Sequence, residues 1–249
     1  MKWRSHIAIA KALADRLGLD ERSGKALSDG SIDPDRYPDS IIRVGRRGRV
    51  YASRAPHHNP SIRIVMRHVW NARMAYLKGD RVRAARSLGR ALHYVQDKSL
   101  SKGFLGLSHG SREDEVALQK VPLEAIDDGI SSAVCSPHYV EKVIREVKPQ
   151  KGVREVMREA CWASAAIAKA VLGMRDPPKE LPSALRHAKE RYWKRTIPLA
   201  ATASMAFLLA AAITRNLLLA LGVLSGYVIQ LLDRKYHYLK KEAKWFGIS

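Results

Sequence analysis

The spacing of apolar residues predicts a chain made almost entirely of helices. Over residues 5–17, apolar side chains recur three or four positions apart, which is the spacing of one helix face. The same spacing predicts helices over 61–78, 81–98, 112–120, 122–133, 138–147 and 151–174. Gly18 and the Gly79-Asp80 pair are expected to end the first two of these helices. We therefore assign the chain to the all-α fold class.

Two stretches depart from the helical pattern in the first half of the chain. Residues 28–40 are dense in Asp, Pro, Gly and Ser, a composition typical of a loop. The segment that follows has no helical period, and it is expected to hold a short strand or hairpin around Val50–Ala52. A second loop is predicted over 99–112.

The C-terminal part is more hydrophobic than the rest. Residues 196–213 and 217–232 form two uncharged arms, each near the lower limit of about 17 residues for spanning hydrocarbon. Basic and aromatic residues flank the outer end of each arm. This pattern predicts a membrane hairpin over 181–249, after an all-α domain over 1–180, with both flanks on the cytoplasmic side. The alternative is a helical hairpin buried in a soluble core or in an oligomer interface.

The amino-acid composition limits the classes of molecule that the protein is expected to bind. The chain carries 44 Lys and Arg against 24 Asp and Glu, a formal net charge of +20. Such an excess favours nucleic acid, an anionic lipid surface or a phosphorylated small molecule. Cys135 and Cys161 lack metal-binding spacing, which argues against a cysteine zinc cluster or a disulfide framework and favours a reduced, intracellular setting. The N-terminus lacks the apolar core and cleavage site of a secretion signal.

One helix carries a candidate metal-ligand pair, His93 and Asp97 in the segment ALHYVQD. Residues four apart share a helix face, so both side chains can reach one ion. Helix geometry, however, turns this pair away from the apolar stripe and toward Arg86 and Arg90, which by itself favours a solvent-exposed face. Other histidines and carboxylates in the first half of the chain strengthen the metal interpretation: His6, Asp33, Asp35, His57, His58, His109 and Glu113. His, Asp and Glu together are the ligands of catalytic zinc sites.

Four segments in order resemble the zinc-dependent phospholipase C family, the alpha-toxin-like all-α fold that is related to zinc-dependent single-strand nucleases. LGRALHYVQD is similar to that family's LGxAxHYxxD helix, and GSIDPD is similar to its GSxxPD loop. WRSH resembles its N-terminal Trp and His, and SHGSRE resembles its later HxxxE pair. The resemblance covers about residues 3–120.

The resemblance implies a set of metal ligands: His6, Asp35, His58, His93, Asp97, His109 and Glu113. It implies that Asp97 bridges two metals, that His6 shares one of these with it, and that His109 and Glu113 hold the remaining ion. Asp35 would also be the general base, and His58 is favoured over His57.

Two departures lower the expected number of ions. Gly103 stands where the family has a further histidine, and Trp3 follows Met1-Lys2, so that its amine is not free to bind metal. We therefore expect one firmly bound zinc ion and at most a second, whereas the family binds three.

A basic segment separates Asp35 from the His57-His58 doublet. It contains Arg43, Arg46, Arg47, Arg49 and Arg54. Arg46 and Arg47 are candidates for holding a substrate phosphate bidentately, and the alternative is a solvated surface that faces anionic lipid.

The function expected from these features is a membrane-attached, zinc-dependent phosphodiesterase of the phospholipase C type. It would act on phospholipid headgroups with a metal-activated water. Two alternatives stay open: a single-strand nuclease, and a non-enzymatic membrane-bound helical scaffold. The small number of aromatic residues near the predicted site disfavours the nuclease, and the two departures from the family pattern favour the scaffold.

Overall fold

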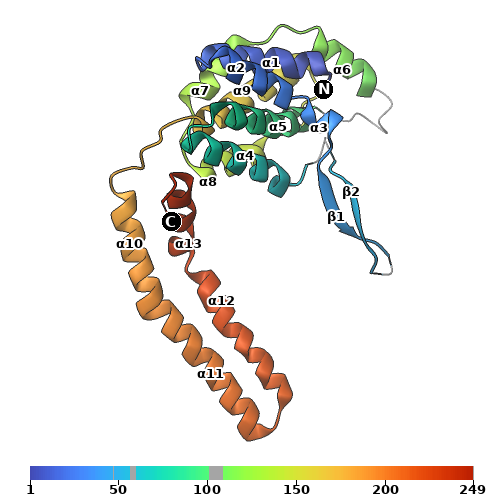
Figure 1. The fold of residues 1–249 in the computed structure, drawn as a ribbon. Helices are drawn as coiled ribbons and strands as arrows, with labels where there is room; N and C mark the ends of the chain where they lie inside the picture. The colour runs from blue at the N-terminus through green and yellow to red at the C-terminus, as the bar shows by residue number, and fades with distance from the viewer. Residues whose placement is uncertain (47, 57–59, 101–108, 249) are drawn as a thin grey trace. The chain divides into compact units, whose positions relative to one another are not determined.

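The structure is a computed structural model that describes residues 1–46, 48–56, 60–100 and 109–248 (Figure 1). Helices dominate it, which confirms the all-α assignment. Tertiary contacts divide the chain into two units, Met1–Met174 and Arg175–Ser249. The division falls shortly before the predicted boundary at residue 180.

The first unit contains helices and one two-stranded sheet. Its elements are α1 (Trp3–Arg16), α2 (Glu21–Gly30), α3 (Asp33–Arg36), β1 (Ser40–Val44), β2 (Val50–Arg54), α4 (Ile62–Leu77), α5 (Arg81–Ser99), α6 (His109–Ala117), α7 (Leu123–Ser131), α8 (Pro137–Glu146) and α9 (Val153–Val171). Most of the predicted helices are present, with ends that differ by a few residues.

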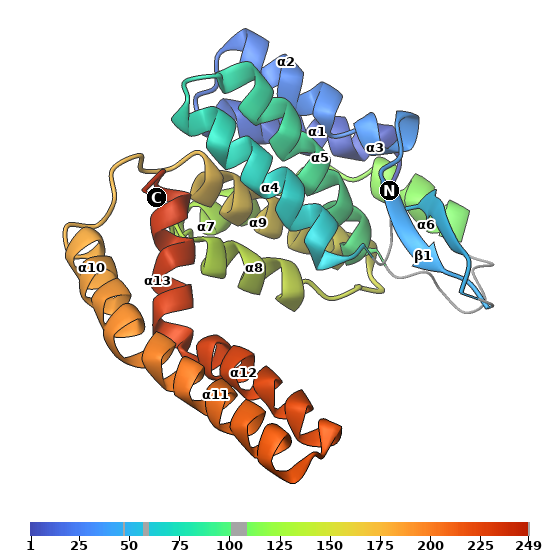
Figure 2. The same ribbon diagram turned by 60° about the horizontal axis from the view of Figure 1, so that its bottom comes forward.

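Helix α5 is the centre of this unit. It packs against α4, α2 and α9, which lie around it on different sides (Figure 2). Leu88 and Leu92 are buried, and so are the polar residues Gln96 and Ser99. A helix that is surrounded in this way buries more than the single apolar stripe seen in its sequence.

The sequence signals for helix ends are confirmed at two glycines. Gly18 and Gly79 adopt positive φ values of 63° and 83°, just beyond the ends of α1 and α4. Glycine takes this left-handed conformation at little cost, which is why it ends helices so often. Asp80 then caps α5, because its side chain accepts a hydrogen bond from the Arg83 backbone N–H.

The prediction of an uninterrupted loop over 28–40 was wrong. Helix α2 runs to Gly30 and one helical turn, α3, follows at Asp33. Asp20 caps α2 by accepting from the Ser23 N–H, and Leu27 buries completely. Packing against neighbouring helices outweighs the low helix propensity of the Ser, Gly and Asp residues.

Two glycines allow α2 and α5 to approach each other closely. A Cβ atom added at Gly89 would lie 2.3 Å from the Leu27 carbonyl oxygen. A Cβ atom at Gly30 would lie 2.2 Å from the Arg86 carbonyl oxygen. Both contacts are with backbone, which cannot move aside as a side chain can. The glycines of the GSIDPD and LGRALHYVQD segments therefore set the spacing of these two helices.

Strands β1 and β2 form the hairpin that was predicted near Val50. They pair antiparallel, with Ser40 opposite Arg54 and Val44 opposite Val50. Gly48 adopts a φ of 70° in the connecting turn.

The second unit forms a helical hairpin. Helix α10 (Leu181–Arg191), a π-helical segment (Tyr192–Thr196) and α11 (Ile197–Thr214) make up the first arm. The chain returns through a 3-10 helix (Leu217–Val223) and α12 (Leu224–Leu232), and α13 (Arg234–Trp245) follows. Leu181–Thr214 is long and apolar enough to cross a membrane, by length and composition. Only 11% of its apolar window is buried within the described chain.

Gly89→Ala should destabilise the first unit by about 1–3 kcal/mol, because the new methyl group overlaps the α2 backbone. Thermal and denaturant unfolding of the full-length chain in detergent, followed by circular dichroism, measures this loss. Gly24→Ala is the matched control, because its Cβ would meet only the Ala14 side chain at 3.3 Å. A loss at Gly24 as large as that at Gly89 would contradict the close-approach explanation.

Candidate metal centre

His93 and Asp97 lie inside the first unit rather than on its surface. His93 is fully buried and Asp97 is 3% exposed. The expectation of a solvent-exposed face, which came from helix geometry alone, was therefore wrong. The reason is the central position of α5, because neighbouring helices cover its polar face as well as its apolar stripe.

The close approach of α2 and α5 fixes the orientation of the His93 ring. The carbonyl oxygen of Ser31, just after α2, lies 2.9 Å from His93 Nδ1. A carbonyl only accepts, so Nδ1 carries the proton and Nε2 presents a lone pair. A backbone carbonyl behind the ring is the arrangement that orients metal-binding histidines.

His6 on α1 is oriented in the same way. Its Nδ1 donates to the side-chain oxygen of Gln96 at 2.6 Å, and the Gln96 amide in turn donates to Ser164 Oγ at 3.0 Å. His6 Nε2 is buried and forms no hydrogen bond in the described part of the chain. A buried polar atom left in this state is costly unless something else binds it.

The two rings and one carboxylate converge on a common point. His6 Nε2 lies 3.2 Å from Asp97 Oδ1, and His93 Nε2 lies 3.4 Å from Asp97 Oδ2. One ligand atom from each of the three residues lies within 4.8 Å of the others. Imidazole lone pairs that face a carboxylate repel it, and a cation between them removes the repulsion. The donor set and the orphaned nitrogen therefore fit a metal ion such as Zn²⁺.

Asp35 borders this group, and an ion pair between the buried Asp33 and the exposed Arg86 helps to place it. Its Oδ1 lies 3.6 Å from His93 Nε2, and its Oδ2 accepts a hydrogen bond from the Trp3 indole at 2.7 Å. The neighbouring Asp33 is paired with both Nε and a terminal nitrogen of Arg86. This pair fastens the short helix α3 to α5 and so directs Asp35 toward the site.

The Met1 amino group also reaches the site. The Met1 nitrogen lies 2.5 Å from Asp97 Oδ1 and 3.1 Å from Glu113 Oε1. The amino group comes from Met1 rather than from Trp3, whose indole contacts Asp35 instead. The Met1 ammonium thus links Glu113, on α6, to Asp97, the carboxylate that His6 also contacts.

The pKa values of the group reflect burial and mutual contact. Burial, together with the nearby His6, lowers the pKa of His93 to about 4, so the ring is neutral at pH 7. Burial alone would raise the pKa of Asp97, but its contacts with neighbouring groups, the Met1 ammonium among them, hold it well below its usual range. Burial likewise opposes protonation of the Met1 amine, yet Asp97 and Glu113 raise its pKa.

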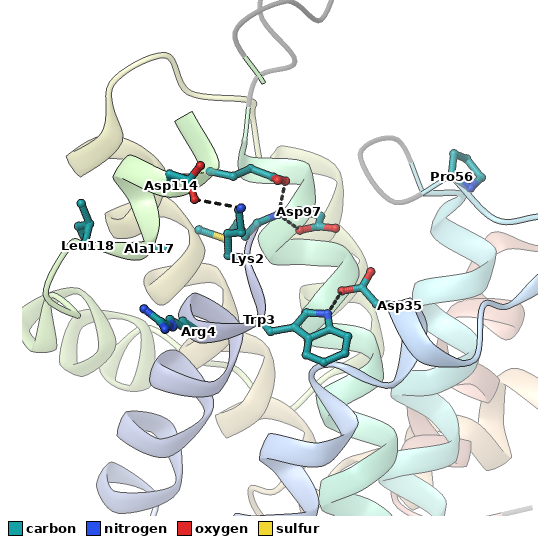
Figure 3. Close-up of a pocket in the computed structure, with 11 residues that line it drawn as sticks. Lys2, Trp3, Arg4, Asp35, Pro56, Asp97, Asp114, Ala117 and Leu118 are labelled. Carbon is teal, nitrogen blue, oxygen red and sulfur yellow. Dashed lines mark hydrogen bonds and ion pairs between the residues drawn. The ribbon is translucent and has the colours of Figure 1, made fainter. Parts of the chain in front are cut away.

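Asp35 and Asp97 reach a cavity of about 1020 Å³ (Figure 3). Trp3 forms part of its wall and points at Asp35, as the close-up shows. The basic residues among those lining it are Lys2 and Arg4, and Lys2 pairs with Asp114 at 2.9 Å. A molecule larger than water can therefore reach the site, and the positively charged side chains of Lys2 and Arg4 line its path.

Some of the other predicted site residues lie outside the part of the chain that the structure describes. His57, His58, Arg47 and Gly103 lie outside the described residues. His109 is the first residue of α6, and its side chain is likewise outside the description. Arg46 is exposed in the hairpin turn and is not among the residues that line the cavity.

Three residues of the site were missed from the sequence: Ser31, Gln96 and Ser164. Ser31 acts through its backbone carbonyl, and no side-chain pattern could reveal that. Gln96 lies inside the ALHYVQD segment, next to Asp97, and its polarity at a position that proves fully buried was the available signal. Ser164 is on α9, far away in the sequence, and only the packed structure brings it to Gln96.

No family model, no curated protein and no solved structure matches the chain in the comparisons.

The full-length protein should bind a single zinc ion tightly, and His93→Gln should weaken binding by more than about 100-fold, because a ligand is lost. Gln96→Ala should weaken it by about 10- to 100-fold, because His6 is no longer oriented. Competition with a chromogenic chelator measures both affinities. His68→Gln, which alters another buried histidine, is the control. Equal zinc affinity in wild type and His93→Gln would contradict the proposed ligand set.

Without metal, the free energy of unfolding should fall as the pH drops from about 6.5 toward 4. In this window the unfolded chain protonates the residue 93 imidazole, whereas the folded chain keeps it neutral because its pKa is lowered to about 4. Denaturant unfolding in the presence of a chelator measures the slope, which should be shallower in His93→Gln. An unchanged slope in this variant would show that His93 is not the titrating group.

Proposed function

We propose that the first unit is a metal-dependent phosphodiesterase of the phospholipase C type. The observation that carries this proposal is the buried convergence of His6, His93 and Asp97 beside a cavity that Asp35 also lines. Two preoriented imidazoles and a carboxylate form the ligand set of a hydrolytic metal site rather than of a structural cysteine site. The resemblance of the sequence motifs agrees with it.

His6, His93 and Asp97 would hold the ion, with Asp35 and Glu113 as additional ligands within reach. A divalent ion bound there supplies a Lewis acid for a phosphoryl oxygen and lowers the pKa of water. Zinc is the ion that the nitrogen-rich donor set favours, because two imidazoles are less suited to magnesium or calcium.

The remaining chemistry belongs to the chain's own residues. The Asp35 carboxylate, held at Oδ2 by the Trp3 indole, keeps Oδ1 directed toward His93 and can accept a proton from an attacking water. Burial of the ring nitrogens excludes bulk water from the ligands. Arg4 is exposed where it lines the cavity, and its guanidinium can bind the phosphate of a substrate.

Membrane attachment through the second unit is the other part of the proposal. Large apolar side chains of α11 and α12 are exposed along both arms, among them Leu208, Ile213, Leu224 and Leu232. Gly226 permits close packing of the arms, because a Cβ there would meet Ser204 and the Ala200 carbonyl. Small residues at helix contacts are common in membranes. The basic flanks on both sides favour the cytoplasmic face for the two ends.

One observation favours a non-enzymatic scaffold as the second candidate. The Met1 ammonium pairs with Asp97 and Glu113, and the Trp3 indole binds Asp35. These ion pairs and this hydrogen bond partly neutralise and solvate the carboxylates without a metal ion. A chain in which they persist would be a membrane-bound helical protein without hydrolytic activity.

Zinc-loaded protein should release a phosphomonoester from phospholipid vesicles. Asp35→Asn should lower kcat by about 100-fold or more, because the proton acceptor is lost, while zinc affinity falls less than in His93→Gln. His138→Gln, on α8 and outside the lining of the cavity, should leave kcat near the wild-type value. Absence of hydrolysis in wild type with one zinc ion bound would instead support the scaffold. Faster cleavage of single-stranded DNA than of lipid would transfer the activity to the nuclease class.

A further inference from the structure

Beyond its first two residue pairs, Ser40–Arg54 and Ile41–Ser53, the hairpin of β1 and β2 has one apolar face and one face with arginine and tyrosine. In an antiparallel pair, opposite residues share a face. The register places Ile42 with Ala52, and Val44 with Val50, on the first face. Arg43 lies opposite Tyr51 on the second face.

The apolar face is open to solvent. Ile42, Val44 and Val50 are exposed by 79%, 71% and 67%. Figure 1 shows both strands extending away from the helices of the first unit. An isolated two-stranded hairpin gains little stability by itself, and three exposed β-branched side chains add no core. Exposed apolar patches of this kind mark an interaction surface.

The charges on the hairpin indicate the chemistry of the partner. Residues 40–54 contain five arginines and no acidic residue. Of these, Arg43, Arg46, Arg49 and Arg54 are exposed, and none forms an ion pair among the residues that the structure describes. Tyr51 and Tyr37, which precedes β1, are also exposed. Apolar side chains together with Arg and Tyr are the composition that settles at an anionic bilayer interface.

The base of the hairpin is anchored firmly, in contrast to its exposed length. Asp39, just before β1, accepts hydrogen bonds from Tyr94 and His68 at 2.8 Å each and from Arg67 at 2.7 Å. Its backbone carbonyl accepts from the N–H of Ala55, which closes the base behind β2. Tyr94 is the tyrosine that follows His93 on α5. The hairpin is thus tied to the helix that carries the metal ligands.

We propose that this hairpin docks onto an anionic phospholipid surface. Ile42, Val44 and Val50 enter the boundary between headgroups and acyl chains, and the arginines bind lipid phosphates. This inference rests on the membrane attachment proposed above and adds a second contact, which belongs to the first unit. Because Asp39 links the hairpin to α5, docking holds the cavity beside Asp35 close to headgroups.

The test uses the full-length chain in vesicles. In a Cys135→Ser, Cys161→Ala background, Val44→Cys carries an environment-sensitive fluorophore, and lipids with spin-labelled acyl chains act as quenchers. We expect strong quenching in vesicles of phosphatidylcholine with phosphatidylserine, and much weaker quenching with phosphatidylcholine alone or in high salt. A label at Ser131→Cys, on the exposed surface of α7, should be quenched in neither.

Charge variants identify the arginines responsible. Replacing Arg43, Arg46 and Arg49 by Gln should lower docking by about 100-fold, since each basic residue contributes about fivefold near an anionic surface. Replacing Arg22, Arg83 and Arg158 by Gln changes the net charge equally outside the hairpin and should leave quenching unchanged. Zinc affinity, measured in parallel, should stay at the wild-type value in both triple variants, as expected for folded protein.

Alkaline extraction of the same vesicles reports on the second unit separately. A chain that resists extraction while the Val44 label stays unquenched overturns the docking proposal and leaves membrane attachment intact. A quenched label on a chain that alkali removes supports docking and contradicts the spanning hairpin. If the hairpin arginines matter for binding an oligonucleotide but not for quenching, the partner is a nucleic acid and the proposal is wrong.

Discussion

Asp97 is a carboxylate in the interior of a helical unit, and its charge must be balanced there. Removal of an ionised carboxylate from water costs several kcal/mol unless cations or hydrogen-bond donors replace the solvent. The chain places two imidazole nitrogens and an amino group around this carboxylate. Both imidazoles donate a hydrogen bond from Nδ1, so that their Nε2 lone pairs point toward Asp97. A cation between these lone pairs and the carboxylate would balance the charge, so the group could hold a metal ion.

The packing of the first unit follows from the need to build that group. Gly30 and Gly89 bring α2 against α5, which puts the Ser31 carbonyl behind His93. Helix α9 supplies Ser164, which holds Gln96 and through it the His6 ring. His6 and His93 are therefore oriented by contacts from three different helices, without any ion present. Such preorganisation is what a catalytic constellation requires from its scaffold.

The sequence was sufficient for most helices and for naming His6, His93 and Asp97, the three residues that the structure brings together. Apolar periodicity located most helices, and glycine marked the ends of α1 and α4. It failed at α2, where packing overrides weak propensity, and at the exposure of His93 and Asp97. That second error has a physical cause, because a single sequence does not show how many neighbours surround a helix. The orienting contacts of Ser31 and Ser164 were equally invisible, since they join segments far apart in the chain.

X-ray absorption at the zinc edge of the zinc-loaded protein would identify the atoms that bind the ion. We expect nitrogen and oxygen ligands only, at about 2.0–2.2 Å, with the multiple scattering of two imidazoles. His93→Gln should lose one imidazole contribution, and His68→Gln should leave the spectrum unchanged. Sulfur scattering at about 2.3 Å, or a spectrum without imidazole in the wild-type protein, would contradict the assignment of His6, His93 and Asp97 as the metal centre.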